Sequence, residues 1–301
     1  MTGEFEFIHW LRTVASPDLR VIVGPGDDCA VLPRPDGRVL VTTDILTEGV
    51  DFVLSECGPR AVGRKAMAVN LSDIAAMGGR PTAAVVGIVA PPGSGGLMQD
   101  LHLGTREMAD RYQVPIVGGD TNSWNGGLVV SVTLLGVPIR EPVLRSGAMP
   151  GDWVFVTGPL GGSILGRHLN PVPRLVEAER LVSFCDMHAM IDVSDGLAKD
   201  AGHVAVESRC GIVFEADAIP VHSDAVKLAK QSGKTPLQHA LGDGEDFELV
   251  FTVSPDDGAK LIAEPPIPVW KIGECLPEAG LWIVERGVRV PLHPTGWEHQ
   301  L

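Results

Sequence analysis

The chain has 301 residues, of which 45% are hydrophobic and 21% charged, a length and composition typical of a folded protein with about two domains. The formal net charge is −14 and no Lys/Arg-rich run is present, so we expect no nucleic-acid partner. The five cysteines form no CxxC pair, which disfavours a disulfide framework or a zinc site and favours a reducing compartment.

The apolar segments of the sequence are short. The smoothest of them, residues 83–92, falls well below the ~20 residues of a membrane-spanning helix. The first ten residues include Glu4, Glu6 and His9, which is not the pattern of a secretory signal. We therefore expect a cytoplasmic protein without a membrane partner.

Periodicity and turn residues predict elements for both halves of the chain. We expect helices over 4–13, 60–77, 97–112, 163–169, 175–184 and 197–208. We expect one strand from 39 to Asp44, and further strands over 83–89, 116–117, 128–135, 153–157, 189–192, 212–215, 248–253, 269–272 and 281–284. Their irregular alternation favours an α+β or mixed α/β fold over a doubly wound one. A Pro/Gly-containing linker over 138–151 predicts domains at 1–140 and 141–301.

Six aspartates share one setting, because each is expected at a strand end or in a turn flanked by Gly, Ser or Thr. They are Asp28, Asp44, Asp73, Asp120, Asp192 and Asp195. One such carboxylate is commonly a helix N-cap or a turn residue. If six converge, their repulsion requires cations.

The ligand chemistry of this set favours one kind of cation. Carboxylates together with the hydroxyls of Thr42, Thr43 and Ser194 are hard oxygen ligands, which suit Mg²⁺ rather than zinc. Several magnesium ions in one cleft would imply a bound polyphosphate.

Two glycine-containing segments resemble phosphate-binding loops. Gly233-Lys234-Thr235 ends like a P-loop, but Leu228 stands where that motif needs its first glycine, so we interpret Gly233 as a helix C-cap. Residues 157–163 join a strand to an expected helix and would either cradle phosphate or form a tight turn. We favour the tight turn.

An ordered set of motifs over nearly the whole chain resembles the thiamine-monophosphate kinase family. The motifs are Gly26-Asp27-Asp28-Cys29-Ala30, Thr43-Asp44, Asn70-Leu71-Ser72-Asp73, Gly118-Gly119-Asp120-Thr121, Arg145-Ser146-Gly147-Ala148, Asp192-Val193-Ser194-Asp195-Gly196-Leu197, Gly244-Glu245-Asp246-Phe247-Glu248-Leu249 and Gly296-Trp297.

The resemblance implies the two-domain fold of aminoimidazole ribonucleotide synthetase and selenophosphate synthetase. In that fold, an N-terminal sheet domain binds ATP and magnesium and pairs in a homodimer, beside a C-terminal α/β domain. The implied activity is ATP-dependent phosphorylation of thiamine monophosphate to thiamine diphosphate. Two alternatives stay open: a related ATP-dependent enzyme acting on another phosphorylated metabolite, and an inactive nucleotide-binding homologue.

The resemblance also implies roles for individual residues, with none acting as a general acid or base. The implied magnesium ligands are Asp28, Thr42, Thr43, Asp44, Asp73, Asp120, Asp192 and Asp195. The implied ATP contacts are Gly119, Asp120, Arg145 and Ser194. The implied thiamine-monophosphate contacts are Asp51, Glu245 and Trp297. Asp51 departs from the family pattern, which often has His at this position.

Overall fold

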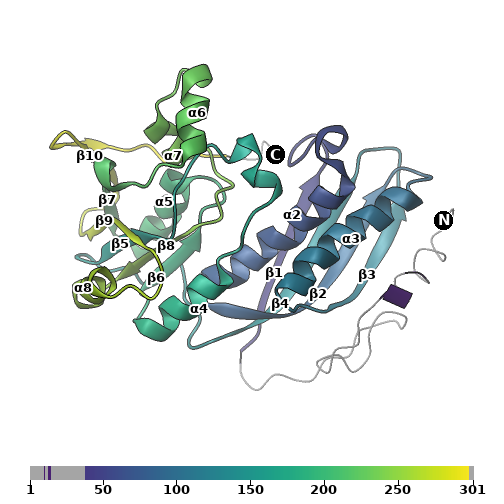
Figure 1. Ribbon diagram of the computed structural model, residues 1–301. Helices are drawn as coiled ribbons and strands as arrows, with labels where there is room; N and C mark the ends of the chain where they lie inside the picture. Colours follow the sequence, from purple (N-terminus) through teal and green to yellow (C-terminus); the bar gives the residue numbers. More distant parts are fainter. Residues whose placement is uncertain (1–9, 11–12, 15–37, 298–301) are drawn as a thin grey trace. The chain divides into compact units, whose positions relative to one another are not determined.

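The computed structural model describes Trp10, residues 13–14 and residues 38–297. The chain divides into two compact units (Figure 1). Unit 1 comprises Met1–Ile74 and Arg80–Pro138, and unit 2 comprises Ala75–Gly79 and Ile139–Leu301. Most of the helix expected over 4–13 lies outside the described residues, and so does Asp28.

Unit 1 is built on a four-stranded sheet with strand order β1-β4-β2-β3. The strands are β1 (Leu40–Thr47), β2 (Gly79–Ala90), β3 (Ile116–Ser123) and β4 (Val129–Pro138). β1 pairs antiparallel with β4, and β2 pairs parallel with β3. Two helices, α2 (Leu54–Ala76) and α3 (Gly95–Arg111), lie on one face of this sheet (Figure 1).

The backbones of α2 and α3 are in direct contact, because each helix has a glycine at the point where the two helices cross. A methyl group added at Gly104 of α3 would lie 1.9 Å from the carbonyl oxygen of Arg60 on α2. A methyl group added at Gly63 of α2 would lie 2.0 Å from the carbonyl oxygen of Leu101 on α3. Any larger residue at either position must separate the two helices.

Unit 2 contains a seven-stranded mixed sheet with strand order β11-β10-β7-β9-β5-β8-β6. The strands are β5 (Trp153–Val156), β6 (Ala189–Asp192), β7 (Gly211–Glu215), β8 (Leu249–Val253), β9 (Trp270–Leu276), β10 (Gly280–Glu285) and β11 (Val288–Pro291). The helices are α4 (Leu175–Phe184), α5 (Leu197–Ser208), α6 (Ser223–Ser232), α7 (Pro236–Gly242) and α8 (Pro255–Ala263). Three short 3-10 turns complete the unit: Ser163–Leu165, Arg167–Leu169 and Ala216–Ala218.

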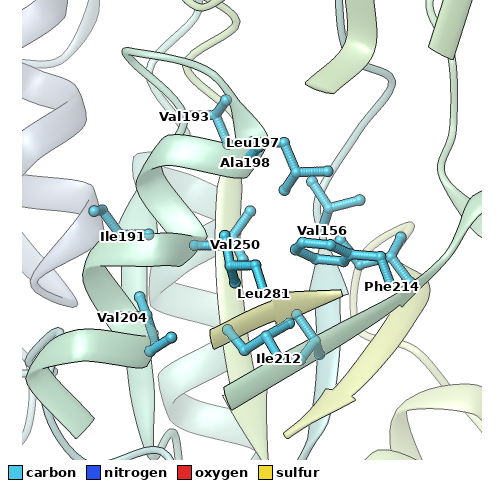
Figure 2. Packing of buried hydrophobic residues seen from close by; sticks show 14 of the residues in the cluster. Val156, Ile191, Val193, Leu197, Ala198, Val204, Ile212, Phe214, Val250 and Leu281 are labelled. Carbon is cyan, nitrogen blue, oxygen red and sulfur yellow. The ribbon is translucent and has the colours of Figure 1, made fainter. Parts of the chain in front are cut away.

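The core of unit 2 lies between α5 and one face of the sheet. Val156 of β5, Ile191 of β6, Phe214 of β7 and Val250 of β8 pack with Leu197 of α5 in one buried cluster (Figure 2). The cluster includes residues near both ends of α5, so the whole helix packs on the sheet. The loop between β6 and α5 is thereby held in a fixed position on the sheet.

The other face of this sheet carries aromatic packing. Side chains alternate along a strand, so Phe155 and Phe251 point away from the cluster that holds their neighbours Val156 and Val250. The two rings stack with centroids 5.5 Å apart. Trp153 lies on the same face and packs on Gly258 of α8. The sheet of unit 2 is therefore covered by helices on both faces.

Several expected elements are confirmed. The boundaries of α4, β6 and α5 agree with the expected ranges, and Gly233 is the C-cap of α6 with φ 74°. The sequence analysis did not predict α7, α8 and β11. The mixed arrangement of strands and helices agrees with the expected fold class. Among the described helices, none has both the length and the apolar character needed to cross a membrane.

Three expectations are wrong in detail. Residues 163–169 form two 3-10 turns instead of a helix, because Gly162 and Gly166 adopt φ values of 74° and 128°. Asp44 and Asp120 lie inside β1 and β3 instead of at strand ends, since β1 continues to Thr47 and β3 to Ser123. Asp73 lies within α2 and not in a turn, in agreement with the helix expected over 60–77.

The helix crossing in unit 1 gives a direct stability prediction. Gly104→Ala should lower the free energy of unfolding by about 1–3 kcal/mol, because the added methyl collides with the Arg60 carbonyl. Gly96→Ala, in the same helix, is the matched control: nothing lies within 4 Å of its added methyl. Urea unfolding of both variants measures the difference, and equal stability of the two would contradict close packing of α2 on α3.

Candidate functional site

In unit 1, the end of α2 is tied to the edge strand β1. The Asp44 backbone N–H donates to Oδ1 of Asn70 at 3.1 Å, and Thr42 Oγ1 donates to Oδ2 of Asp73. Asn70 is fully buried, and its Nδ2 donates to the Ala66 carbonyl at 3.0 Å. Side chains two apart on a strand share a face, so Thr42 and Asp44 lie on the side of Asp73. The structure thus brings three of the predicted metal ligands together.

Thr43 points to the opposite face of the same strand. Its Oγ1 donates to the Val132 carbonyl at 3.1 Å and accepts from Thr133 Oγ1 at 3.0 Å. Because neighbouring side chains on a strand alternate, the hydroxyls of Thr42 and Thr43 face opposite sides. One ion therefore cannot take both hydroxyls as ligands.

Asp120 stands on β3, at the other edge of the sheet. Its carboxyl group is exposed, and Oδ1 accepts from the Thr121 backbone N–H at 2.9 Å. The preceding residue must be glycine, because a methyl at Gly119 would lie 2.0 Å from the Val86 carbonyl oxygen. Three strand spacings separate β1 from β3, which is about 14 Å along the sheet. Asp44 and Asp120 are therefore too far apart to hold one ion together.

The connection between β1 and α2 uses the carboxylate of Asp51 internally. Asp51 Oδ2 accepts from the Thr47 backbone N–H at 2.7 Å, and this bond closes the turn. The fully buried Lys65 extends its Nζ to the Asp51 backbone carbonyl at 2.7 Å. The sequence analysis gave Lys65 no role. A lysine within an Ala-rich helix was the signal that could have identified this contact. The structure gives Asp51 a turn-closing role in addition to the substrate contact expected for it.

In unit 2, the loop between β6 and α5 concentrates negative charge. Asp192 is the last residue of β6 and is 4% exposed. Asp200 reaches back from α5, and its Oδ2 accepts from the backbone N–H groups of Asp195 and Gly196, each at 3.0 Å. Burial, with the added repulsion of Asp192 and Asp195, raises the pKa of Asp200 to about 8.

This charge arrangement fits a divalent cation. Ligand atoms of Asp195, Asp200 and His203 lie within 4.8 Å of one another. Asp192 and Ser194 add further oxygen donors on the same loop. Magnesium prefers hard oxygen ligands, which the aspartates and Ser194 offer and the imidazole of His203 does not. A cation here would offset the repulsion of Asp192 and Asp195, which adds to the effect of burial on the pKa of Asp200. The residues present therefore fit the magnesium that the sequence predicts.

A second loop, residues 243–248, packs its backbone against the first. Glu245 N–H donates to the Ser194 carbonyl at 2.7 Å, and Phe247 N–H donates to the Val193 carbonyl at 2.8 Å. Glu245 and Phe247 both adopt left-handed conformations, with φ values of 52° and 53°. Non-glycine residues seldom adopt this conformation, and such strain is concentrated at functional sites. The loop therefore holds Glu245 in a fixed place beside Ser194.

Buried carboxylates attach this second loop to the 157–163 segment and to Arg167. Asp246 accepts from the Gly161 backbone N–H and from Arg167, each at 2.8 Å. Asp243 accepts from the Gly162 N–H at 2.9 Å. These carboxylates occupy the amide groups of the 157–163 segment, so the structure supports the tight-turn interpretation over a phosphate cradle.

The 295–297 segment packs on the first loop from another side. Trp297 N–H donates to the Asp195 carbonyl at 3.0 Å. A methyl group at Gly296 would lie 2.5 Å from the same carbonyl oxygen, so only glycine allows this approach. The Trp297 side chain is 52% exposed. The structure thus brings together Asp195, Ser194, Glu245 and Trp297.

Arg145 lies elsewhere in the same unit. Its backbone carbonyl accepts from Ser208 Oγ at 3.0 Å, at the C-terminal end of α5. Asp195 and Ser194 precede the N-terminal end of that helix. A helix of 12 residues is about 18 Å long, so the structure does not bring the backbone of Arg145 close to Ser194.

Known proteins share this architecture and sequence. The N-terminal domain model of the AIR synthase related protein family matches residues 26–138. A structure of thiamine-monophosphate kinase from Stenotrophomonas maltophilia is 31% identical, with a TM-score of 0.79 over 92% of this chain and 94% of that chain. A structure of AaThiL complexed with AMPPCP and TMP is 30% identical, with a TM-score of 0.78 over 99% of this chain and 97% of that chain.

A curated relative supplies the assignment. The thiamine-monophosphate kinase of Rhodopirellula baltica is 42% identical over 289 residues, which cover 93% of this chain and 91% of the relative. Identity at this level over nearly the whole length of both proteins confirms the resemblance seen in the ordered motifs. The chain belongs to the thiamine-monophosphate kinase family.

Proposed function

We propose that this chain transfers the γ-phosphoryl group of ATP to thiamine monophosphate, giving thiamine diphosphate and ADP. The observation that carries the proposal is the packing of Ser194, Asp195, Glu245 and Trp297 around one acidic loop, in a chain 42% identical to a thiamine-monophosphate kinase. A related structure contains AMPPCP, a non-hydrolysable analogue of ATP, together with TMP.

Phosphoryl transfer to a phosphate acceptor requires alignment of the two substrates and neutralisation of their charge, and it does not require removal of a proton. A phosphate acceptor is already ionised at neutral pH, so no general base is needed. Bound magnesium ions supply neutralisation of the polyphosphate charge. The residues that would hold them are Asp28, Thr42, Thr43, Asp44, Asp73 and Asp120 in the first half, and Asp192 and Asp195 in the second.

We assign the nucleotide contacts to Gly119, Asp120, Arg145 and Ser194. Gly119 carries no side chain, because a methyl group there would collide with the Val86 carbonyl. A backbone without a side chain suits close contact with a phosphate. Arg145 offers a planar fork of donors for phosphate oxygens. Because its backbone lies at the far end of α5 from Ser194, the two residues would contact different parts of the nucleotide.

We assign the acceptor contacts to Asp51, Glu245 and Trp297. The half-exposed ring of Trp297 offers a flat face for a cationic thiazolium or a pyrimidine. The backbone of Glu245 is held on Ser194, next to the Asp195 carbonyl that accepts from Trp297, so both residues are attached to the same loop. Asp51 would contribute while its Oδ2 closes the turn with Thr47.

We further propose that the protein acts as a homodimer in the cytoplasm. Val41 and Ile45 of β1 are apolar, yet they are 65% and 64% exposed. Because side chains alternate along a strand, both lie with Thr43 on the same face of the sheet. A second copy of the same sheet face would bury these apolar side chains. Cys57, Cys185, Cys210 and Cys275 form no disulfide in the described part of the chain, which suits a reducing compartment.

The metal-ligand assignment predicts a specific loss of activity. Wild-type protein should convert thiamine monophosphate and ATP to thiamine diphosphate and ADP only with magnesium present. Asp73→Asn and Asp120→Asn should each lower the turnover more than about 100-fold, since loss of even an indirect metal contact costs 10–100-fold. Chromatography of the thiamine phosphates measures the conversion.

The control for this assay is Asp100→Asn, the same acid-to-amide change at an exposed position of α3. Full activity of the control beside inactive Asp73 and Asp120 variants supports the assignment. Wild-type protein that binds ATP with magnesium and leaves thiamine monophosphate unchanged would contradict the acceptor and favour another phosphorylated metabolite. Binding without turnover of any acceptor would favour an inactive homologue.

The proposed dimer predicts a change in mass. Wild-type protein should sediment at twice the 31.9 kDa of one chain, and Ile45→Glu should sediment as a single chain because a buried carboxylate opposes pairing. Val206→Glu, at a residue of α5 that is 74% exposed, is the control and should leave the mass unchanged. A dimer that persists in Ile45→Glu would place the interface on another surface.

A further inference from the structure

Lys199 connects two parts of the candidate site that the sequence analysis treated separately. Its Nζ lies 3.0 Å from Oδ2 of Asp195, the carboxylate assigned to a cation. The same Nζ donates to the backbone carbonyl of Trp297, the residue assigned to the acceptor. One ammonium group therefore has one partner at the cation site and one partner at the acceptor site.

The 295–297 segment is attached to the body of unit 2 close to this lysine. Trp297 N–H donates to the Asp195 carbonyl at 3.0 Å. A methyl added at Gly296 would lie 2.8 Å from Cβ of Lys199, so the segment passes directly over the lysine stem. Thr295 runs past Gly242, on the side of the 243–248 loop. The placement of Trp297 thus depends on contacts with Asp195 and Lys199.

A cation at Asp195 would change the balance of these contacts. An ammonium group and a divalent cation on one carboxylate repel each other, so Lys199 opposes cation binding there. The other partner of Lys199, the Trp297 carbonyl, is neutral and keeps its attraction. Cation binding would therefore weaken the ion pair of Lys199 with Asp195. The hydrogen bond from its ammonium group to the Trp297 carbonyl would remain.

We propose that Lys199 is a positioning residue that couples cation occupancy at Asp195 to the placement of Trp297. The proposal rests on the proposed function for the presence of a cation at Asp195. The coupling is reciprocal: Lys199 weakens cation binding by pairing with Asp195, and the cation alters how firmly the 295–297 segment is held. Lys199 contacts neither reacting phosphate in this account, and its effect passes through Asp195 and Trp297.

The test removes the charge of Lys199 and keeps most of its stem. Lys199→Met should bind Mn²⁺ about two- to fivefold more tightly in the presence of a non-hydrolysable ATP analogue, because the competing ammonium group is gone. Electron paramagnetic resonance of free Mn²⁺ measures this affinity. A merely structural lysine would not tighten cation binding when it is replaced.

A second measurement follows the segment itself. Hydrogen exchange of a peptide covering 293–297 should respond to Mg²⁺ and the ATP analogue in the wild-type protein. In Lys199→Met, the same peptide should exchange faster without the cation and respond less to its addition. Lys199→Arg keeps the charge and should restore both behaviours.

The matched control is Lys227→Met, which removes a lysine that pairs with Asp224 at 2.7 Å on α6. It should change neither Mn²⁺ affinity nor exchange of the 293–297 peptide. Unchanged or weaker Mn²⁺ binding in Lys199→Met, or an exchange response equal to that of the wild type, would overturn the coupling.

Neither measurement uses thiamine monophosphate, so the outcomes separate this proposal from the proposed function. Both effects in Lys199→Met, beside a wild-type protein that leaves thiamine monophosphate unchanged, would overturn the acceptor and support the coupling. Active wild-type protein with no effect in Lys199→Met would support the function and overturn the coupling.

Discussion

The candidate site of unit 2 depends on main-chain contact between three segments. The β6–α5 loop, the 243–248 loop and the 295–297 segment touch backbone to backbone, and glycine stands at each contact. A methyl at Gly244 would lie 2.6 Å from the Ser194 carbonyl, and one at Gly296 would lie 2.5 Å from the Asp195 carbonyl. Since backbone atoms cannot rotate away as side chains do, the relative positions of Ser194, Glu245 and Trp297 are set by the fold.

Charge is the second constraint on this site. Asp200 satisfies the amides at the start of α5, and it does so beside Asp192 and Asp195. Burial raises the pKa of Asp200 to about 8, and the repulsion of Asp192 and Asp195 adds to this shift. A protein that keeps such a group without a counter-charge loses stability, whereas one that binds a cation there recovers it. The acidic loop thus carries more negative charge than the capping of α5 by Asp200 requires.

The sequence predicted the elements wherever periodicity was regular. The ranges of α4, β6 and α5 follow from clear apolar patterns; Asp192 ends β6, and Asp195 lies in the loop between β6 and α5. The helix expected over 163–169 fails because Gly162 and Gly166 take positive φ values, which a pattern of apolar residues does not reveal. Asp44 and Asp120 lie inside strands because pairing with β4 and β2 extends those strands past the polar residues.

The candidate site was predictable in its residues and not in its geometry. Motifs identified Glu245 and Trp297 one by one, but their approach to Ser194 and Asp195 arises from tertiary contacts that Gly244 and Gly296 make with the backbone of that loop. The opposite orientation of Thr42 and Thr43 likewise required the register of β1. Lys199 belongs to no functional motif, and only its two contacts in space single it out.

The most direct test of the account is anomalous diffraction from crystals grown with Mn²⁺ and a non-hydrolysable ATP analogue. The account predicts manganese peaks at about 2.1 Å, the oxygen distance of a small divalent cation, from carboxylates of Asp73 or Asp120 and of Asp192 or Asp195. A bound nucleotide whose manganese ions contact none of these four carboxylates would contradict the central claim that the aspartates form the cation site.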